Sequence, residues 1–475
     1  MQSRIQKGVL WSSIEKFSIS GIQFMLNVIL ARLIVPGEYA LIAMISIFIA
    51  IGQTFIDSGF SQALIQKLNR TEKDFSTVFY FNIVVAVIIY VCIYLIAPYI
   101  AEFYNNNVFI KLTRIIGLNL IISSLAIVQR TKLIINVDFK TLARGSIFSV
   151  CVSGFVGIVC AYCNLGVWAM VLQSVLYQIL LTSFLFISLK WYPKLLFSFE
   201  SFRQLFSYGS KLLFSRLLNT VCQNLYSIII GKYYPSSNVA YYNTANQIAV
   251  FPSGHLTDMI NRAIFPLQCE LQNNIYQLRK IYLTFIRLST YVIVPIMIGI
   301  LVLSEPFIKL LLTDKWLDVI PLLQILCLAN MLYPIMSSNQ MFNVLGRTDI
   351  YLKLEIIKKV FFVIILIITL PLGIVMMCWG ICIYNIIEII ITIILLKRIF
   401  PINFYDIVKS VYPIFLISFS MGFFMYFITT FFEMPIVKLF VGAVSGIFIF
   451  ISFSILFKFR EYKSILSMIK FIKIK

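Results

Sequence analysis

Charged side chains occur inside several apolar segments of this sequence, where each needs a partner. A charge within the hydrocarbon layer of a membrane is costly, so such residues usually face a partner or a water-filled cavity and often serve transport. With a helical rise of roughly 1.5 Å per residue, Glu15 and Asp57 lie about 10 Å inside their segments and Arg216 about 16 Å inside. This pattern suits the binding of a charged solute or a coupling ion. On the first, second, seventh and eighth of these segments, and leaving aside Lys211 close to the start of its segment, the six charges of this kind are Glu15, Lys16, Asp57, Arg216, Asp258 and Arg262.

The same charges also allow a structural interpretation. The acids can form ion pairs with neighbouring helices, and a long basic side chain near a helix end, such as that of Arg262, can extend to the lipid headgroups. Glu388 is a further acid in the middle of an apolar segment, where it can either couple to a proton or hydrogen-bond a neighbouring helix. The ion-coupling candidates are therefore Glu15, Asp57, Asp258 and Glu388.

These residues are positioned by apolar segments that fill the chain almost from end to end. Hydrophobic residues make up 60% of the 475 residues and charged residues 12%, and a spanning helix needs about 20 mostly apolar residues. This predicts an all-α polytopic membrane protein with about fourteen transmembrane helices, or one fewer if the segment with Lys111 and Arg114 does not cross. The predicted spans are 8–34, 39–65, 75–100, 109–128, 146–163, 165–189, 205–230, 240–265, 283–303, 319–341, 356–372, 374–396, 412–431 and 436–457.

Lysines and arginines collect in every second connection between these spans. Short loops rich in Lys and Arg stay on the cytoplasmic side of a membrane, which predicts that both termini are cytoplasmic. The net charge of +20 is spread over short loops beside anionic lipid headgroups, rather than gathered on one folded face with aromatic residues. We therefore expect membrane lipids, and no nucleic acid, as partners.

Other kinds of chemistry find little support in the sequence. The nine cysteines lie within or beside spans without nearby histidine or acidic partners, which favours packing over metal binding. No G-x-x-x-x-G-K-[ST] loop is present, and the connections are too short to hold a soluble catalytic domain. We predict a transporter without a cofactor or metal site, and not an enzyme.

An internal repeat relates the two halves of the chain. Six spans separate the copies, so both halves enter the membrane in the same direction and form parallel repeats around a central cavity, as in some transporters. We predict an N-terminal lobe of residues 1–200, a C-terminal lobe of residues 201–400, and two additional helices with a basic tail in residues 401–475. At an offset of 200 residues, the aligned pairs include Lys16 and Arg216, Gln23 and Gln223, Arg32 and Lys232, and Ala40 and Ala240.

Several segments of the sequence resemble a known family of membrane transporters. The resemblance extends from about residue 8 to residue 396 and weakens over the last two spans. It is to the bacterial polysaccharide transporters of the multidrug/oligosaccharidyl-lipid/polysaccharide exporter superfamily, and in particular to the Wzx-like branch with teichuronic-acid and colanic-acid exporters. The segments are LARLIVPGEYALIAM at 30–44, FIDSGFSQALIQK at 55–67, STVFYFN at 76–82, IVQRTKL at 127–133, FSYGSKLL at 206–213, FPSGHLTDMINRAIFP at 251–266, PLLQILCLANMLYPI at 321–335 and NVLGRTDIYLKLEIIKKV at 343–360.

The resemblance implies a MATE-like fold and a flippase function. Such a protein would move undecaprenyl-diphosphate-linked oligosaccharide units across the bacterial inner membrane by alternating access, for the synthesis of lipopolysaccharide O-antigen, capsule or exopolysaccharide. Polysaccharide polymerase and chain-length proteins would be further partners. One alternative is a cation-coupled drug or metabolite exporter of the same superfamily. Another is a membrane enzyme of polysaccharide assembly, which would need a larger outer connection than residues 304–318.

The substrate that the resemblance implies assigns roles to the polar residues within the spans. A diphosphate needs cations, and sugar hydroxyls need side chains that form hydrogen bonds. The substrate-binding candidates are Lys16, Arg216 and Arg262 for the phosphates, and Gln23, Gln223 and Asn224 for the hydroxyls.

Overall fold

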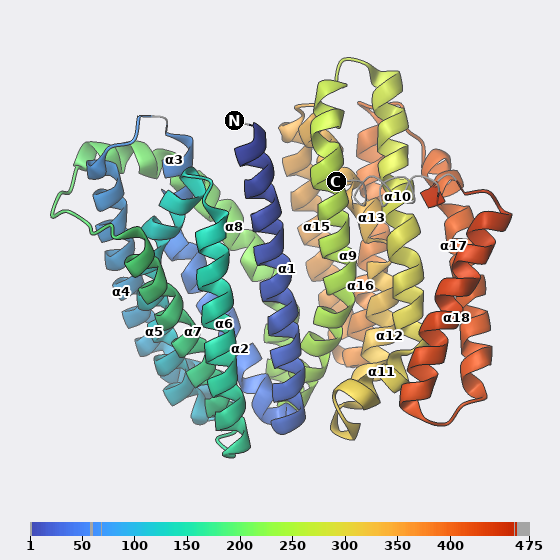
Figure 1. Ribbon diagram of the computed structural model, residues 1–475, viewed down its shortest axis with the longest axis horizontal. Coiled ribbons are helices and arrows are strands. Elements are labelled where there is room, and N and C mark those ends of the chain that lie inside the picture. The colour runs from blue at the N-terminus through green and yellow to red at the C-terminus, as the bar shows by residue number, and fades with distance from the viewer. Residues whose placement is uncertain (1, 58–59, 68, 460, 463–475) are drawn as a thin grey trace. The chain divides into compact units, whose positions relative to one another are not determined.

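The computed structural model describes residues 2–57, 60–67, 69–459 and 461–462. Some side chains within these ranges, including those of Lys16 and Arg262, lie outside the described part. The regular elements of the described ranges are helices (Figure 1). Contacts divide the chain into two compact units, residues 1–240 and residues 241–475.

The first unit is built from long helices and one short helix. Within it, α1 packs on α6, α6 on α7, α4 on α5, and α2 on α8. Fully buried apolar side chains such as Leu30, Ile56 and Val128 lie inside this unit. Its helices are α1 (Gln2–Leu33), α2 (Pro36–Asp57), α3 (Phe60–Gln66), α4 (Glu72–Phe103), α5 (Val108–Ile135), α6 (Phe139–Tyr162), α7 (Val167–Leu189) and α8 (Phe199–Tyr233).

The local sequence determines where these helices begin. Thr71 starts α4 with a capping box: its hydroxyl accepts from the backbone N–H of Asp74, and the Asp74 carboxylate accepts from the backbone N–H of Thr71. Asp138 and Ser198 accept from backbone amides at the starts of α6 and α8. Pro36 opens α2, at a position where a missing N–H costs no helical hydrogen bond. Side chains of these types satisfy the first amides of a helix and so specify its start.

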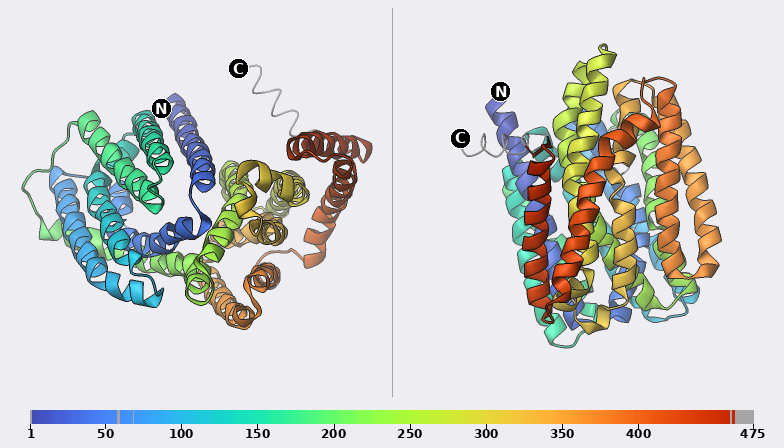
Figure 2. Two further views of the ribbon diagram at one scale, coloured as in Figure 1. Left: turned by 90° about the horizontal axis from the view of Figure 1, so that it is seen from below. Right: turned by 90° about the vertical axis from the view of Figure 1, so that its right-hand side faces the viewer.

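The second unit contains the remaining helices, and most of α9 belongs to it. Within it, α10 packs on α12 and α17, α16 on α12 and α15, and α17 on α18; the last two helices lie at one edge of the unit (Figure 2). The elements are α9 (Ser236–Glu270), α10 (Ile275–Val302), α11 (Ser304–Leu311), η1 (Asp314–Trp316), α12 (Val319–Asn330), α13 (Tyr333–Met336), η2 (Ser337–Gln340), α14 (Met341–Val344), α15 (Thr348–Thr369), η3 (Leu370–Leu372), α16 (Ile374–Lys397), α17 (Phe404–Thr430) and α18 (Pro435–Leu456).

The helices confirm the predicted all-α polytopic fold class. In the described ranges, nine helices are long and apolar enough to span a membrane, namely α2, α4 to α7, α10 and α16 to α18, and the bent pair from Val319 to Val344 adds a tenth. The more polar helices α1, α8, α9 and α15 are 32, 35, 35 and 22 residues long. Each of the fourteen predicted spans therefore overlaps a helix or a bent helix pair.

Two predicted spans are not continuous helices. The predicted span 39–65 was too long, because α2 ends at Asp57 and a separate helix, α3, begins at Phe60. The predicted span 319–341 is broken by a bend of 41° between α12 and the helical segment that follows it. Pro334 lies at the start of α13 and has no N–H with which to continue the hydrogen bonding of α12.

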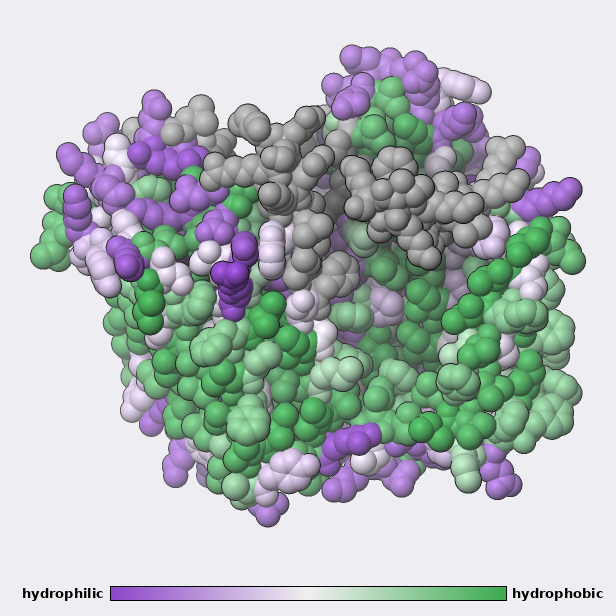
Figure 3. Space-filling model, viewed as in Figure 1, coloured by the Kyte–Doolittle hydropathy of each residue, from purple (hydrophilic) through white to green (hydrophobic). Residues whose placement is uncertain are grey.

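The surface of each unit fits a lipid environment. On the faces shown in Figure 3, a hydrophobic band is bordered by hydrophilic residues along both edges. Large apolar side chains are exposed in both units, for example Leu95 and Phe448. Apolar surface of this extent is unfavourable in water and favourable in a bilayer, where helices satisfy their own backbone hydrogen bonds.

The helix boundaries follow the internal repeat. α1 ends at Leu33 and α8 at Tyr233, and the next helices begin at Pro36 and Ser236, so the two breaks are 200 residues apart. The contacts of α8 with α2 place it in the first unit. The predicted division into two lobes and an additional pair of helices stays a prediction.

The orientation of the termini also stays a prediction, and α4 allows a direct test of it. Asn69 and Asn107 are exposed residues in the connections before and after this helix. In a cysteine-free protein, we expect Asn107→Cys to react with a membrane-impermeant maleimide in spheroplasts, and Asn69→Cys to react only after the membrane is permeabilised. The reverse labelling pattern would place both termini outside the cytoplasm.

Candidate functional site

Four charged side chains of the first unit form what we call the acid–arginine cluster: Glu15 of α1, Asp57 of α2, Arg130 of α5 and Arg216 of α8. Arg130 acts electrostatically on both acids, and Arg216 acts on Asp57. Glu15 is 8% exposed, Asp57 and Arg216 are half-buried, and Arg130 is exposed. The structure therefore brings together charges that are far apart in the sequence and that balance to zero when all four are ionised.

Neutral side chains hold the acids of the cluster in place. The Ser146 hydroxyl of α6 donates to Glu15 Oε1 over 3.4 Å, and Gln53 Nε2 donates to Asp57 Oδ1 over 3.3 Å. The Ser123 hydroxyl of α5 in turn donates to Gln53 Oε1 over 2.9 Å. These bonds orient Gln53 and Asp57 on α2 relative to α5.

The two arginines of the cluster keep their hydrogen-bonding capacity. In the described part of the chain, neither Arg130 nor Arg216 forms an ion pair or a side-chain hydrogen bond, although both lie within electrostatic range of Asp57. A guanidinium offers five N–H donors in a planar fork that matches phosphate and carboxylate oxygens. The cluster can therefore bind an anionic group without first breaking an arginine–carboxylate contact.

The remaining substrate-binding candidates have different surroundings. Gln23 and Gln223 are exposed on α1 and α8. Asn224 donates through Nδ2 to the Thr220 carbonyl of its own helix over 2.8 Å, which leaves its amide oxygen for other contacts. The hydroxyls of Thr220 and Thr54 lie 3.2 Å apart and join α8 to α2. The side chains of Lys16 and Arg262 lie outside the described part, so their roles stay predictions.

Arg130 was not among the candidates identified from the sequence. The predicted fourth span ended at residue 128, which placed Arg130 in a connection as one of its cytoplasmic cations. The structure extends α5 to Ile135, so Arg130 is a helical residue, and it acts electrostatically on Glu15 and Asp57. The IVQRTKL segment could have signalled this, because Leu133 continues the apolar helical pattern of Ile127 and Val128 past Arg130.

A second group of charges lies inside the second unit, and we call it the Lys358 triad. Lys358 Nζ lies 2.7 Å from Glu355 Oε1, three residues earlier on α15, and 2.7 Å from Glu388 Oε1 on α16. Glu388, one of the predicted ion-coupling acids, thus has a partner that sequence reasoning missed. Asp258, another of these acids, is half-buried on α9 and acts electrostatically on Tyr333 of α13, as does Glu388.

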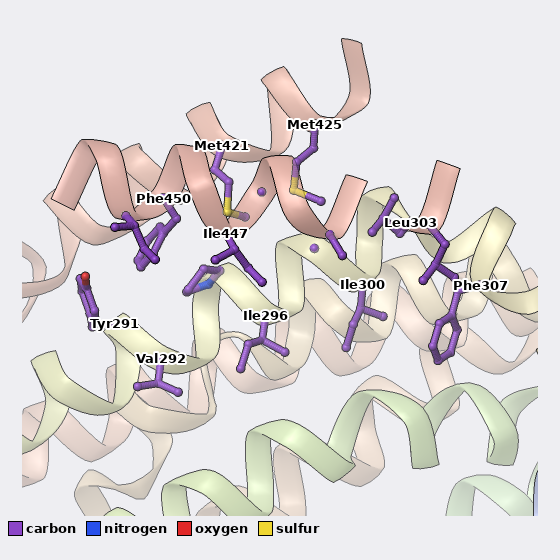
Figure 4. Close-up of a pocket in the computed structure, with 16 residues that line it drawn as sticks. Tyr291, Val292, Ile296, Ile300, Leu303, Phe307, Met421, Met425, Ile447 and Phe450 are labelled. Atoms are coloured by element: carbon purple, nitrogen blue, oxygen red, sulfur yellow. The ribbon is translucent and has the colours of Figure 1, made fainter. Parts of the chain in front are cut away.

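The second unit also contains an apolar cavity of about 410 Å³ between α10, α11, α17 and α18. Ile296 and Ile300 of α10 face Met421 and Met425 of α17 across it (Figure 4). None of the described residues that line this cavity is charged, so it suits hydrocarbon and not a sugar or a phosphate. In the described part of the chain, no group of three or more His, Cys, Asp or Glu residues is placed to hold a metal ion.

Comparison with known sequences identifies relatives with roles in polysaccharide biosynthesis. A family model described as "Polysaccharide biosynthesis protein" matches residues 29–321. The chain is 28% identical to the teichuronic acid biosynthesis protein TuaB of Bacillus subtilis (strain 168) over 356 residues, which cover 73% of this chain and 72% of TuaB. It is 22% identical to the lipopolysaccharide biosynthesis protein WzxC of Escherichia coli (strain K12), with 76% of this chain and 74% of WzxC covered.

Comparison with solved structures identifies the fold. The lipid II flippase MurJ, in its inward closed conformation, matches with a TM-score of 0.76 at 16% sequence identity, covering 96% of this chain and all of MurJ. An inward-facing multidrug resistance transporter of the MATE family, a member of the MOP superfamily, matches with a TM-score of 0.58 at 16% identity, covering 81% of this chain and 97% of that protein. The chain is a multi-pass membrane protein with a MurJ- and MATE-like fold.

Proposed function

Because the chain belongs to the family of polysaccharide biosynthesis proteins, we propose that it is a transporter that moves a lipid-linked oligosaccharide across the bacterial inner membrane. The headgroup of such a lipid is an undecaprenyl diphosphate that carries a short glycan. It would cross by alternating access from the cytoplasmic to the outer leaflet, for the synthesis of O-antigen, capsule or exopolysaccharide. The relatives in polysaccharide biosynthesis and the MATE-like fold support this proposal.

The observation that carries the proposal is the pair of unengaged arginines in the acid–arginine cluster. A diphosphate carries negative charge, and cationic donors bind it through charge-assisted hydrogen bonds. Arg130 and Arg216 supply guanidinium forks, while Glu15 and Asp57 balance their charge when the substrate is absent. Gln23 and Gln223 are exposed amides at repeat-related positions on α1 and α8, and we assign them to the glycan hydroxyls.

The apolar cavity of the second unit supports a substrate with a lipid chain. Its lining is made of aliphatic side chains, aromatic rings and methionines, which accept hydrocarbon without strict shape requirements. Gly299 lines this cavity, and a Cβ added there would meet no atom within 4 Å. The cavity therefore has room for a methylene chain at this position.

A larger side chain in the cavity tests whether the cavity holds the lipid chain of the substrate. We expect Gly299→Leu to fold normally but to lower polysaccharide export several-fold, because the added side chain occupies space that the lipid chain needs. Export is measured as surface polysaccharide at matched levels of membrane protein, and lipid retained by the purified protein is measured by mass spectrometry. Gly299→Ala is the control, since one methyl group leaves most of the cavity open. Full export and full lipid retention in Gly299→Leu would show that the cavity does not hold the lipid chain during transport.

The proposed function itself is tested in cells. A strain that lacks this protein should lose surface polysaccharide and accumulate the lipid-linked oligosaccharide at the cytoplasmic leaflet, because synthesis continues while export stops. The lipid fraction is extracted and its glycan-bearing diphosphates are quantified by mass spectrometry, and the intact gene should reverse both changes. Loss of polysaccharide without accumulation of the precursor would instead indicate a role in synthesis.

A further inference from the structure

Lys358 joins two acids from neighbouring helices in the interior of the second unit. Its ammonium group contacts Glu355 and Glu388 at 2.7 Å each. The side chains of Lys358 and Glu388 are 7% and 6% exposed, whereas that of Glu355 is 23% exposed. With all three groups ionised, the Lys358 triad carries one net negative charge in a place of low polarity, and Glu355 is its most accessible member.

A buried net charge is unfavourable, and one added proton removes it. The proton converts one carboxylate to a carboxylic acid, while the other carboxylate keeps its ion pair with Lys358. Because the three groups interact strongly, the proton belongs to the triad rather than to one residue. A metal cation is a poorer ligand here, since the ammonium already occupies an oxygen of each acid and repels a second cation at short range.

The triad lies beside the broken transmembrane span. Asn385, one turn before Glu388 on α16, donates to the carbonyl oxygen of Ala329 over 3.0 Å, in the last turn of α12 before the 41° bend. Thr392, one turn after Glu388, is 1% exposed, and its hydroxyl has no hydrogen-bond partner within the described ranges. In transporters, broken helices inside the membrane are tolerated where they line a cavity, and they often bind coupling ions. The polar face of α16 thus has features of an ion site.

Among the described residues, two tyrosines interact electrostatically with the triad. Tyr351 of α15 interacts electrostatically with all three members, and Tyr333 of α13 interacts with Glu388. Tyr333 also interacts electrostatically with Asp258 of α9, so it is within range of two acids that the sequence identified as ion-coupling candidates. α16, which carries Glu388, packs on α12. The thiols on these two helices are those of Cys327 on α12 and of Cys378 and Cys382 on α16.

We propose that Glu355, Lys358 and Glu388 form a site that binds and releases one proton, and that this proton is the coupling ion of transport. The coupling role rests on the function proposed above, whereas the proton site does not. Glu355 exchanges the proton with water, and Glu388 transmits the change in charge to α16 and the broken span. When the proton resides on Glu388, this acid loses its ion pair with Lys358, which loosens the contact between α15 and α16.

Infrared difference spectroscopy in lipid nanodiscs tests the proton site without any substrate. As the pH of the buffer falls, the wild-type protein should gain the carbonyl band of one buried carboxylic acid. Glu388→Gln and Glu355→Gln should each lose this band, because either change leaves a neutral pair of Lys358 with one acid. Glu305→Gln, which removes an exposed acid paired with Lys309 on α11, should retain it.

Two outcomes would overturn the proton site. One is a carbonyl band that persists in both glutamine variants, and the other is a wild-type spectrum that responds to sodium and not to pH. The coupling role is tested separately, in proteoliposomes with an imposed pH gradient: transport by the wild type should follow the gradient, and transport by Glu388→Gln should not. If the carbonyl band titrates as expected but wild-type transport does not depend on the pH gradient, the proposed coupling role is wrong and the proton site is still supported.

Discussion

Arg216→Ala is expected to lower polysaccharide export roughly 10- to 100-fold while the protein still inserts and accumulates in the membrane. This is the effect of losing a charge-assisted hydrogen bond worth about 1.5 to 3 kcal/mol, here between Arg216 and the diphosphate. Arg216→Lys should retain part of the activity, because an ammonium keeps the charge but lacks the planar fork. Surface polysaccharide, normalised to the amount of membrane protein, is the measurement.

A second variant separates substrate binding from structural charge pairing. Arg216 acts electrostatically on Asp57, so a purely structural arginine would leave this acid uncompensated when removed. In that case Arg216→Ala combined with Asp57→Asn should recover export. If Arg216 binds the substrate, the double variant should stay inactive. Recovery would therefore contradict our assignment.

Lys358→Met is expected to destabilise the protein by about 3 to 5 kcal/mol, the usual effect of leaving a buried charge without its partner. Both acids of the Lys358 triad then lack a cation, and Glu388 is buried with a side-chain exposure of 6%. Thermal unfolding of purified protein at neutral pH is the measurement.

Two comparisons make this prediction specific. Adding Glu388→Gln to Lys358→Met should recover much of the lost stability, because only Glu355, the more exposed acid, remains. Lys309→Met removes a cation from an exposed ion pair with Glu305 and should change stability little, since water solvates the remaining acid. Equal melting temperatures for Lys358→Met and the wild type at neutral pH would show that the triad does not stabilise the fold.

Most of the fold could be predicted from the sequence, because transmembrane helices depend mainly on local composition. Each predicted span overlaps a helix or a bent pair, and the break between α1 and α2 recurs 200 residues later between α8 and α9. The errors in the prediction concern the continuity and the length of individual spans. Apolar composition alone does not reveal that α2 ends at Asp57, or that Pro334 follows a bend inside an apolar segment.

The charged sites were harder to predict, because their partners depend on tertiary packing. Arg130 lies two residues beyond the predicted end of its span, and Lys358 lies only two residues inside the predicted span 356–372. Both positions suggest headgroup contact, but α5 continues to Ile135 and α15 begins at Thr348. Each cation is therefore well inside a helix. Arg130 acts electrostatically on Asp57 of α2, and Lys358 forms an ion pair with Glu388 of α16. Helical periodicity does not show which helices are neighbours, so these interactions could not be predicted.

Reconstituted transport tests the central claim most directly. Purified protein is placed in liposomes with a fluorescent undecaprenyl-diphosphate oligosaccharide, and a membrane-impermeant quencher reports the fraction of lipid exposed in the outer leaflet. We predict that the wild type makes nearly all of the lipid accessible over time, and that the variant Arg130→Ala/Arg216→Ala quenches no more than protein-free liposomes do. Wild-type protein that is folded and correctly inserted, yet leaves the inner-leaflet lipid protected, would contradict the proposal that this chain transports lipid-linked oligosaccharides.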